Sequence, residues 1–114
     1  MKTNLQTRKL ISALKKEGQK VKLWRRVADE LERPTRQLPS VNLVKLSKYI
    51  RDGEIALVPG KVLSTGTLGK KMTVAAFQFS EAAREKISEA KGEAISLEEL
   101  LQKNPRGNNV RILK

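Results

Sequence analysis

The glycine-rich segment over residues 59–73, PGKVLSTGTLGKKMT, holds the residue types in this chain that most readily bind phosphate. A nucleotide-hydrolysing Walker A loop needs a glycine five residues before its Gly-Lys pair, so that backbone amides can curl around a phosphate, but Ser64 stands at that position. Residues 66–69, GTLG, followed by Lys70 and Lys71, are closer to the GxxG loop with which a KH domain clamps a nucleic-acid backbone. The KH loop joins two helices, whereas strands are predicted on both sides here. The segment predicts a phosphate contact by glycines and two lysines, against the alternative of an ordinary hairpin turn with solvated lysines.

Other catalytic and metal-binding chemistry has little support in the composition. The chain contains no cysteine and no histidine, which excludes disulfides, thiolate nucleophiles, Cys/His zinc sites and imidazole acid–base catalysis. Asp29, Glu30 and Glu32 fall on a predicted helix among arginines, while Glu98 and Glu99 suit the start of another helix. An enzyme built on a Lys-carboxylate pair near the glycine turn has no support beyond the glycines. We therefore predict a protein that is not an enzyme and that takes no cofactor, metal ion or small-molecule substrate.

The charge of the chain indicates a polyanionic partner. Its 24 Lys and Arg outnumber 12 Asp and Glu, for a formal net charge of +12, and such self-repulsion is more tolerable when phosphates neutralise it. Residues 1–51 hold 14 Lys and Arg against 4 Asp and Glu, whereas residues 81–99 hold 3 against 6. An anionic membrane would require bulky aromatics on a basic helix, and the few aromatics here include Trp24, which suits the core better than base stacking. The pattern favours electrostatic, shape-led binding of structured RNA over sequence-read DNA.

The basic first part of the chain is predicted to be helical. Apolar residues recur at helical spacing over residues 5–17, with Asn4 as a candidate N-cap and Gly18 as a left-handed terminator, and again over residues 22–32. Two prolines then predict a basic loop over residues 33–40. These elements would crowd lysines and arginines at their junctions.

Strands and helices are predicted to alternate over the rest of the chain. Residues 41–43 predict a short strand and residues 44–51 a helix, on which Lys45, Lys48 and Arg51 would line one face. Further strands are predicted over residues 54–60, 61–66, 73–79 and 110–113, and the first of these ends in a Pro-Gly turn. One helix is predicted over residues 81–91, with Ser80 as its N-cap and Gly92 as its terminator. Another is predicted to begin at Ser96 and to end at Asn104-Pro105.

These elements predict a single compact domain of mixed α/β class over residues 1–114. Within it we expect a basic helical region with a Pro-rich loop over residues 1–40 and an α/β core over residues 41–114. No stretch approaches the roughly 20 apolar residues that a membrane span needs, and the N-terminus lacks the apolar run of a signal peptide. We therefore expect a cytoplasmic protein.

Three stretches resemble a known family in their order and spacing. They are VNLVKLSKYIRDGEIALVPGKVLSTGTL over residues 41–68, TVAAFQFSEAA over 73–83 and NPRGNNVRI over 104–112. They are similar to the archaeal and eukaryotic large-subunit ribosomal proteins of the eighteen-e family, which is related to the bacterial large-subunit protein fifteen. The short length resembles the archaeal members. Two local departures are Ser64, where relatives often have glycine, and Gln37 with Leu38, where relatives tend to be basic.

The resemblance implies an irregular superhelix of β-β-α units and a structural place in the large ribosomal subunit, packed on 23S-type rRNA and beside neighbouring ribosomal proteins. Lys and Arg would neutralise closely packed RNA phosphates and so brace RNA segments against one another. A free-standing RNA-binding factor or chaperone is the alternative. The residues expected to contact rRNA are Lys9, Arg25, Arg26, Arg33, Arg36, Lys45, Lys48, Arg51, Lys61, Lys70, Lys71, Arg106 and Arg111.

Overall fold

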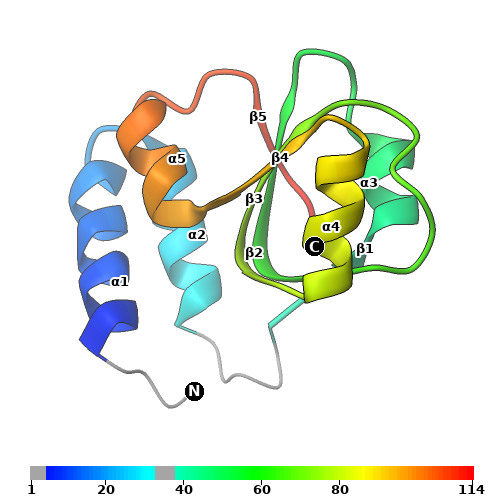
Figure 1. Cartoon of the computed structure of the whole chain (residues 1–114). Coiled ribbons are helices and arrows are strands. Elements are labelled where there is room, and N and C mark those ends of the chain that lie inside the picture. The colour runs from blue at the N-terminus through cyan, green and yellow to red at the C-terminus, as the bar shows by residue number, and fades with distance from the viewer. Residues whose placement is uncertain (1–4, 33–37) are drawn as a thin grey trace.

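The computed structural model describes residues 5–32 and 38–114, apart from the side chains of residues 5 and 6, as an α/β domain with two helices at its N-terminal end (Figure 1). The elements in chain order are α1 (Leu5–Gly18), α2 (Lys22–Leu31), β1 (Ser40–Asn42), α3 (Leu43–Tyr49), β2 (Ile55–Leu63), β3 (Thr73–Phe79), α4 (Glu81–Glu89), β4 (Glu93–Ser96), α5 (Leu97–Lys103) and β5 (Val110–Ile112). The mixed α/β class predicted from the sequence is confirmed. No helix in the described part of the chain is long and apolar enough to cross a membrane.

The strands form one five-stranded sheet in which every pairing is parallel, and β2 is its centre. One side of β2 pairs with β3, which pairs in turn with β4; the other side pairs with β5 near its beginning and with β1 near its end. Ile55, Thr73, Glu93 and Val110 lie in register as the first residues of β2, β3, β4 and β5. These four strands therefore begin along one edge of the sheet, which we call the strand-start edge.

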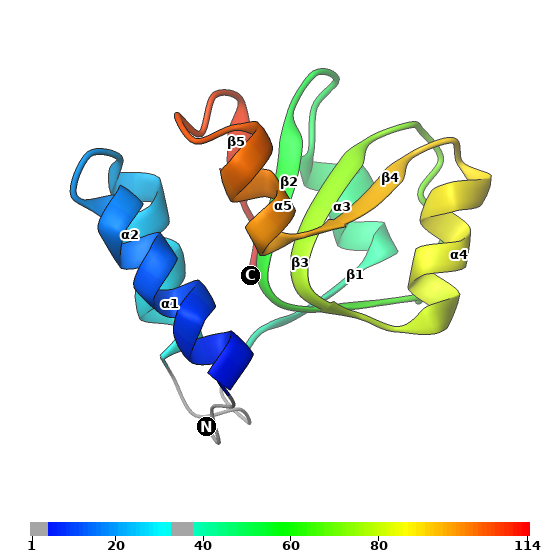
Figure 2. The ribbon, with the colours of Figure 1, turned by 60° about the vertical axis from the view of Figure 1, so that its left-hand side comes forward.

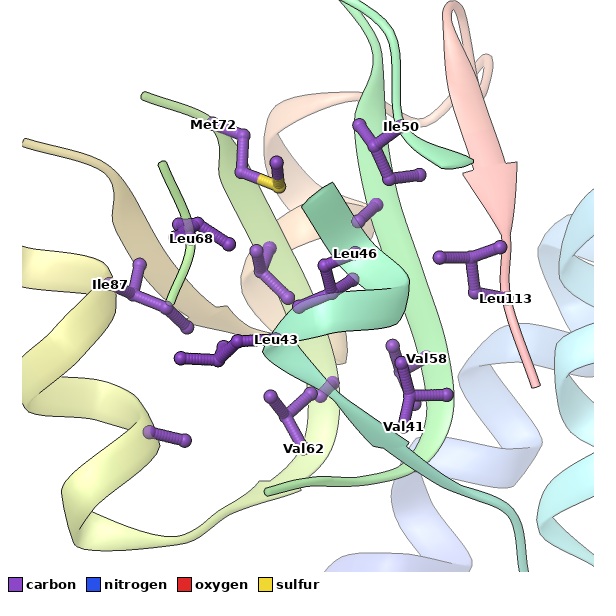
Figure 3. Packing of buried hydrophobic residues seen from close by; sticks show 14 residues of the cluster. Val41, Leu43, Leu46, Ile50, Val58, Val62, Leu68, Met72, Ile87 and Leu113 are labelled. Atoms are coloured by element: carbon purple, nitrogen blue, oxygen red, sulfur yellow. The ribbon is translucent and has the colours of Figure 1, made fainter. Parts of the chain in front are cut away.

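Both faces of the sheet are buried, and the alternation of side chains along β2 and β3 divides the core in two. Val58 and Val74 belong to a cluster under α3 and α4 (Figure 3). Leu57 and Ala75 belong to a second cluster with residues of α1, α2 and α5, the helices whose ribbons Figure 2 shows. This pattern is expected for a parallel sheet, which is normally covered on both sides. Each cluster contains strand and helix residues, so the N-terminal helices share their core with the sheet.

The second cluster is anchored by Trp24, which the sequence correctly placed in the core. Its side chain is fully buried on α2, and its indole Nε1 donates a hydrogen bond of 2.7 Å to the carbonyl oxygen of Pro105. The apolar ring therefore packs in the core while its polar atom is satisfied by the loop before β5. That bond ties α2 to the C-terminal part of the chain.

The predicted Pro-Gly turn is wrong, because β2 continues through Pro59 and Gly60. The strand pairs with β3 on both sides of this dipeptide, and the register shifts between Val58 and Lys61, which marks a bulge. Gly60 is needed for close packing: a Cβ there would lie 2.0 Å from the carbonyl oxygen of Pro39, which accepts a hydrogen bond of 3.0 Å from the Lys61 amide. Gly60 therefore allows β2 to pack closely against the chain at Pro39 and does not turn the chain.

The predicted caps Ser80 and Ser96 are confirmed, and the third predicted cap, Asn4, lies outside the described residues. Helix α5 ends at Lys103, at the predicted break, but Gly18 does not end α1 in the left-handed conformation and α4 ends at Glu89, before Gly92. Ser80 Oγ accepts from the Ala83 amide and Ser96 Oγ from the Glu99 amide, at 3.1 Å each. Gly18 is not left-handed; it is the last residue of α1, and a Cβ there would lie 2.8 Å from the Arg25 backbone nitrogen. After α4 the left-handed residue is Lys91, with φ 63°, and not Gly92.

Strand β4 was missed by the sequence analysis. It contains only four residues, Glu93–Ser96, and only Ile95 among them is buried. So short a segment between two helices carries little periodicity. Pairing with β3 over four residues makes it a strand.

The close approach at Gly60 leads to a test by substitution. Gly60→Ala should lower the free energy of unfolding by about 3 kcal/mol, because the new methyl group overlaps a backbone oxygen that cannot move independently. Gly53→Ala is the control: Gly53 has φ 84° and nothing within 4 Å of the point where the new methyl group would lie, so only a backbone cost of about 1 kcal/mol is expected. Urea unfolding of the two variants measures the difference. Equal stability of the two would contradict the role assigned to Gly60.

Candidate nucleic-acid interface

The glycine loop between β2 and β3 is a crossover connection, so the hairpin alternative is wrong. The two strands that it joins are parallel, and the loop must carry the chain back to the strand-start edge. Gly66 and Gly69 have φ of 89° and 71°, which are left-handed values that favour glycine. Ser64 does not adopt positive φ, so the departure from glycine at this position causes no backbone strain.

Side chains from two helices hold this loop by its carbonyl oxygens. Lys86 Nζ on α4 donates to the carbonyl oxygens of Ser64 and Gly66, at 2.8 and 3.0 Å. Ser47 Oγ on α3 donates to the carbonyl oxygens of Thr67, at 3.0 Å, and Leu68. The loop is therefore held in place by the two helices, and these four carbonyl oxygens are hydrogen-bonded within the protein.

The two lysines after the loop have different roles. Lys70 is half-buried, and its Nζ donates to the carbonyl oxygen of Ile50, the residue that follows α3. An ammonium group at this end of a helix satisfies an unpaired carbonyl and complements the helix dipole. Lys71 is exposed and has no carboxylate within ion-pair distance in the described structure. Lys71 alone of the pair is free to contact a phosphate.

The stripe of cations predicted on α3 is only partly correct. The helix ends at Tyr49, so Arg51 lies beyond it on the way to the strand-start edge. Lys45 Nζ donates to the carbonyl oxygen of Lys114 at 2.5 Å and is half-buried. Lys48 is exposed and lies 5.5 Å from the centre of the Tyr49 ring. Lys48 therefore faces solvent, whereas Lys45 is engaged within the protein.

Four of the predicted contacts gather at the strand-start edge. Arg51 and Lys71 lie in the segments that lead into β2 and β3, Arg106 lies in the loop before β5, and Arg111 is the middle residue of β5. All four are exposed. Arg111 forms an ion pair of 3.8 Å with Glu54, and such an exposed pair contributes at most about 1 kcal/mol. These guanidinium and ammonium groups are available to an external anion.

The helix α2 extends this basic edge. A Cβ at Gly107 would lie 2.5 Å from Leu23 Cδ2, so the loop that carries Arg106 packs directly on the start of α2. Arg25 and Arg26 are exposed in this part of the helix, and Arg25 forms an exposed ion pair of 3.6 Å with Asp29. The arginines of α2 and of the loop before β5 therefore lie on neighbouring elements, although they are about 80 residues apart in sequence.

The remaining predicted contacts lie elsewhere. Lys9 is exposed on α1, where it lines a groove with Leu10, Ala13 and Glu98. Lys61 is exposed on β2, beyond the bulge and away from the strand-start edge. Arg33 and Arg36 lie outside the described residues. The predicted set therefore spans several surfaces and does not form one compact site.

Seven predicted contacts share two properties that favour phosphate binding. Each is exposed and forms no ion pair with any carboxylate of residues 5–32 and 38–114: Lys9, Arg26, Lys48, Arg51, Lys61, Lys71 and Arg106. Sequence reasoning did not select Lys91, which is exposed and lies beside Lys71 in a groove at the strand-start edge. Lys91 follows helix α4 in the sequence, and the residues around it contain no phosphate-binding motif that would have indicated it. In the same described part of the chain, no three acidic residues gather where they could hold a metal ion.

Comparison with known proteins identifies one family. The family model described as "Ribosomal protein 60S L18 and 50S L18e" matches residues 6–114. The chain is 44% identical to the large ribosomal subunit protein eL18 of Methanoregula boonei, covering 99% of this chain and 95% of that protein. It is 46% identical to the protein of the same name from Sulfurisphaera tokodaii, covering 98% and 93%, and 43% identical to the one from Methanococcus maripaludis, covering 99% and 96%.

The different environments of Lys70 and Lys71 predict different effects of the same substitution. Lys70→Met should lower the free energy of unfolding by about 1 to 2 kcal/mol, because the Ile50 carbonyl loses a charged donor. Lys71→Met, the matched control, should change it by no more than about 0.5 kcal/mol. Thermal and urea unfolding of the two variants measure these changes in the free energy of unfolding. A larger loss of stability in the Lys71 variant than in the Lys70 variant would reverse these assignments.

Proposed function

Because this chain belongs to the family of the large ribosomal subunit protein eL18, matched over nearly its whole length, we propose that it is a structural constituent of the large ribosomal subunit. In that place it binds 23S-type rRNA and neighbouring ribosomal proteins. The family is one of ribosomal proteins and not of enzymes. The resemblance found in the sequence motifs is therefore confirmed at the level of the family.

The exposed and unpaired cations are the observation that supports rRNA binding by this chain. An RNA that approaches Arg26, Arg51, Lys71 or Arg106 meets a positive charge with no carboxylate to displace in the described structure. Each contact releases condensed counterions and positions the protein on the backbone. Because these cations lie on more than one surface, the protein can hold separate RNA segments together. Arg33 and Arg36 stay in the proposed set on sequence grounds alone.

The lysines engaged within the protein have a different place in this proposal. Lys45 and Lys70 donate to carbonyl oxygens and are half-buried. We assign them to the support of α3 and its surroundings, and expect a smaller direct share in RNA binding. Arg25 and Arg111 keep a direct role because their exposed ion pairs are weak.

Helix α4 fits contact with a protein better than contact with RNA. Glu81, Glu85 and Glu89 recur every four residues, are exposed, and form no ion pair within the described residues. Like charges at this spacing repel one another on a helix and repel phosphate. We therefore place this surface toward ribosomal proteins, in line with the negative balance of residues 81–99.

Two finer structural statements belong to the same proposal. The run β2, β3, α4 is one β-β-α unit, and the continuation into β4 and α5 supports the irregular superhelix that the family resemblance implies. The basic region over residues 1–40 and the α/β core over residues 41–114 differ in charge and in secondary structure, and we do not propose them as separate folding units. The shared cluster under α1 and α2 supports a single folding unit over residues 1–114.

Sedimentation separates this proposal from a free RNA-binding factor or chaperone. We expect the protein in extracts of its own cells to remain with the large subunit on sucrose gradients after washing in high salt. Packing between RNA segments protects contacts that a transient electrostatic complex would lose. Recovery mainly in the soluble fraction, with intact subunits in the same gradient, would support the free factor.

The electrostatic account predicts the salt dependence of binding. Affinity of the purified chain for large-subunit rRNA fragments should fall steeply with salt, and Arg26→Gln or Arg106→Gln should each reduce the slope of log K against log salt by about 1. Glu85→Gln, on the acidic helix, is the matched amide control and should leave the slope unchanged. Filter binding over a series of salt concentrations measures this. A flat dependence for the unchanged protein would be incompatible with phosphate-led binding.

A further inference from the structure

A groove at the strand-start edge combines charge and shape in a way that the sequence did not indicate. Its volume is about 480 Å³, and its lining includes Arg51, Lys71 and Lys91 together with Glu54 and Glu93. The three cations come from the segments preceding β2, β3 and β4, which the parallel register brings side by side. None of the three forms an ion pair with a carboxylate in the described structure.

Each of the two carboxylates of the groove has a cationic partner outside it. Glu54 accepts a hydrogen bond of 2.8 Å from the Arg51 backbone amide and pairs with Arg111 at 3.8 Å. Glu93 pairs with Lys103 on α5 at 3.3 Å. Neither Arg111 nor Lys103 lines the groove. The lining cations therefore keep their positive charge for an incoming anion.

The backbone conformation of Lys91 is a second and independent observation. Its φ of 63° is left-handed, and this position directly after the cap of α4 is one that glycine usually fills. The adjacent Gly92 is required for a different reason, because a Cβ there would lie 2.4 Å from the Met72 carbonyl oxygen. A lysine is thus held in a costly conformation at the rim of a cationic groove. Strain of this kind is a feature of functional positions.

We propose that Arg51, Lys71 and Lys91 form a binding site for the sugar–phosphate backbone of rRNA at a bend or bulge, with Lys91 as a contact that the sequence-predicted set lacks. This inference rests on the proposed function and names one place where it operates. The groove provides two ammonium groups as point charges and one guanidinium able to bind phosphate in a bidentate manner. A bent or bulged RNA backbone can place a phosphate inside the groove, whereas the backbone of a regular duplex would pass over the groove without entering it.

The surroundings of the groove favour a polymer over a free phosphate or mononucleotide. Arg111 lies on the adjacent strand, and Arg106 lies in the loop before it. A nucleic-acid backbone that leaves the groove along this edge meets further exposed cations, whereas a small ligand cannot reach them. Continuous contact along the edge would add affinity that a single phosphate does not have.

The substitution Lys91→Gly tests the effect of the Lys91 charge on RNA binding without destabilising the fold. Glycine suits the left-handed backbone, so the variant should unfold at the same or a higher temperature than the unchanged protein. Its affinity for the large-subunit rRNA fragment should nevertheless fall about fivefold, with the salt slope reduced by about 1. The matched control is Asn109→Gly, because Asn109 also has a left-handed φ, of 60°, and carries no charge. Asn109→Gly should bind rRNA as the unchanged protein does.

The outcomes distinguish this inference from the proposed function. If Lys91→Gly and Lys71→Ala both bind rRNA as the unchanged protein does, and the unchanged protein keeps its steep salt dependence, the groove makes no RNA contact and the broader proposal stands. If the unchanged chain neither binds rRNA nor sediments with the subunit, the broader proposal fails. Inorganic phosphate and adenosine monophosphate are titrated separately by NMR. Binding of either one that is lost in Lys91→Gly, without any change in rRNA affinity, would show a small-ligand site and overturn the inference.

Discussion

The contact of β2 with the chain before β1 is the constraint on which the rest of the structure depends. At Gly60 the strand passes so close to the Pro39 carbonyl that no side chain fits, and the Lys61 amide binds the same oxygen. This contact keeps β2 continuous through a proline and a glycine that would otherwise turn the chain. Since β2 pairs with β1, β3 and β5, its path sets the register of the sheet and the position of both cores.

A continuous β2 also determines where charge gathers. Because all pairings are parallel, the segments before β2, β3, β4 and β5 meet at one edge, and these segments contain Arg51, Lys71, Lys91 and Arg106. Ligands of open parallel sheets usually bind beyond the carboxyl ends of the strands. In this protein, these four cations lie instead at the amino ends of the strands. The edge opposite to the usual one is thus one of the basic surfaces that we propose to contact RNA.

Two groups of lysines in the described structure have different physical roles. Lys45, Lys70 and Lys86 donate to backbone carbonyl oxygens and hold α3, the glycine loop and the C-terminal residues in place. Lys61, Lys71 and Lys91 are exposed and form no ion pair within the described residues. Formal charge therefore overstates the surface available to phosphate, because an ammonium bound to a carbonyl must lose that bond to reach an external anion.

The sequence by itself determined the class of the domain, the caps at Ser80 and Ser96, the burial of Trp24, the basic character of the chain and its family, because these depend on residue type and on spacing within one element or motif. Only the tertiary structure decided that residues 59–60 lie within a strand, that Gly18 and Gly92 serve close packing, and that Lys70 is engaged while Lys71 is free. It also brought Lys91 beside Arg51 and Lys71. These facts depend on how separate elements pack against one another, and the local pattern of residues contains no information about which carbonyl or strand of another element will lie alongside.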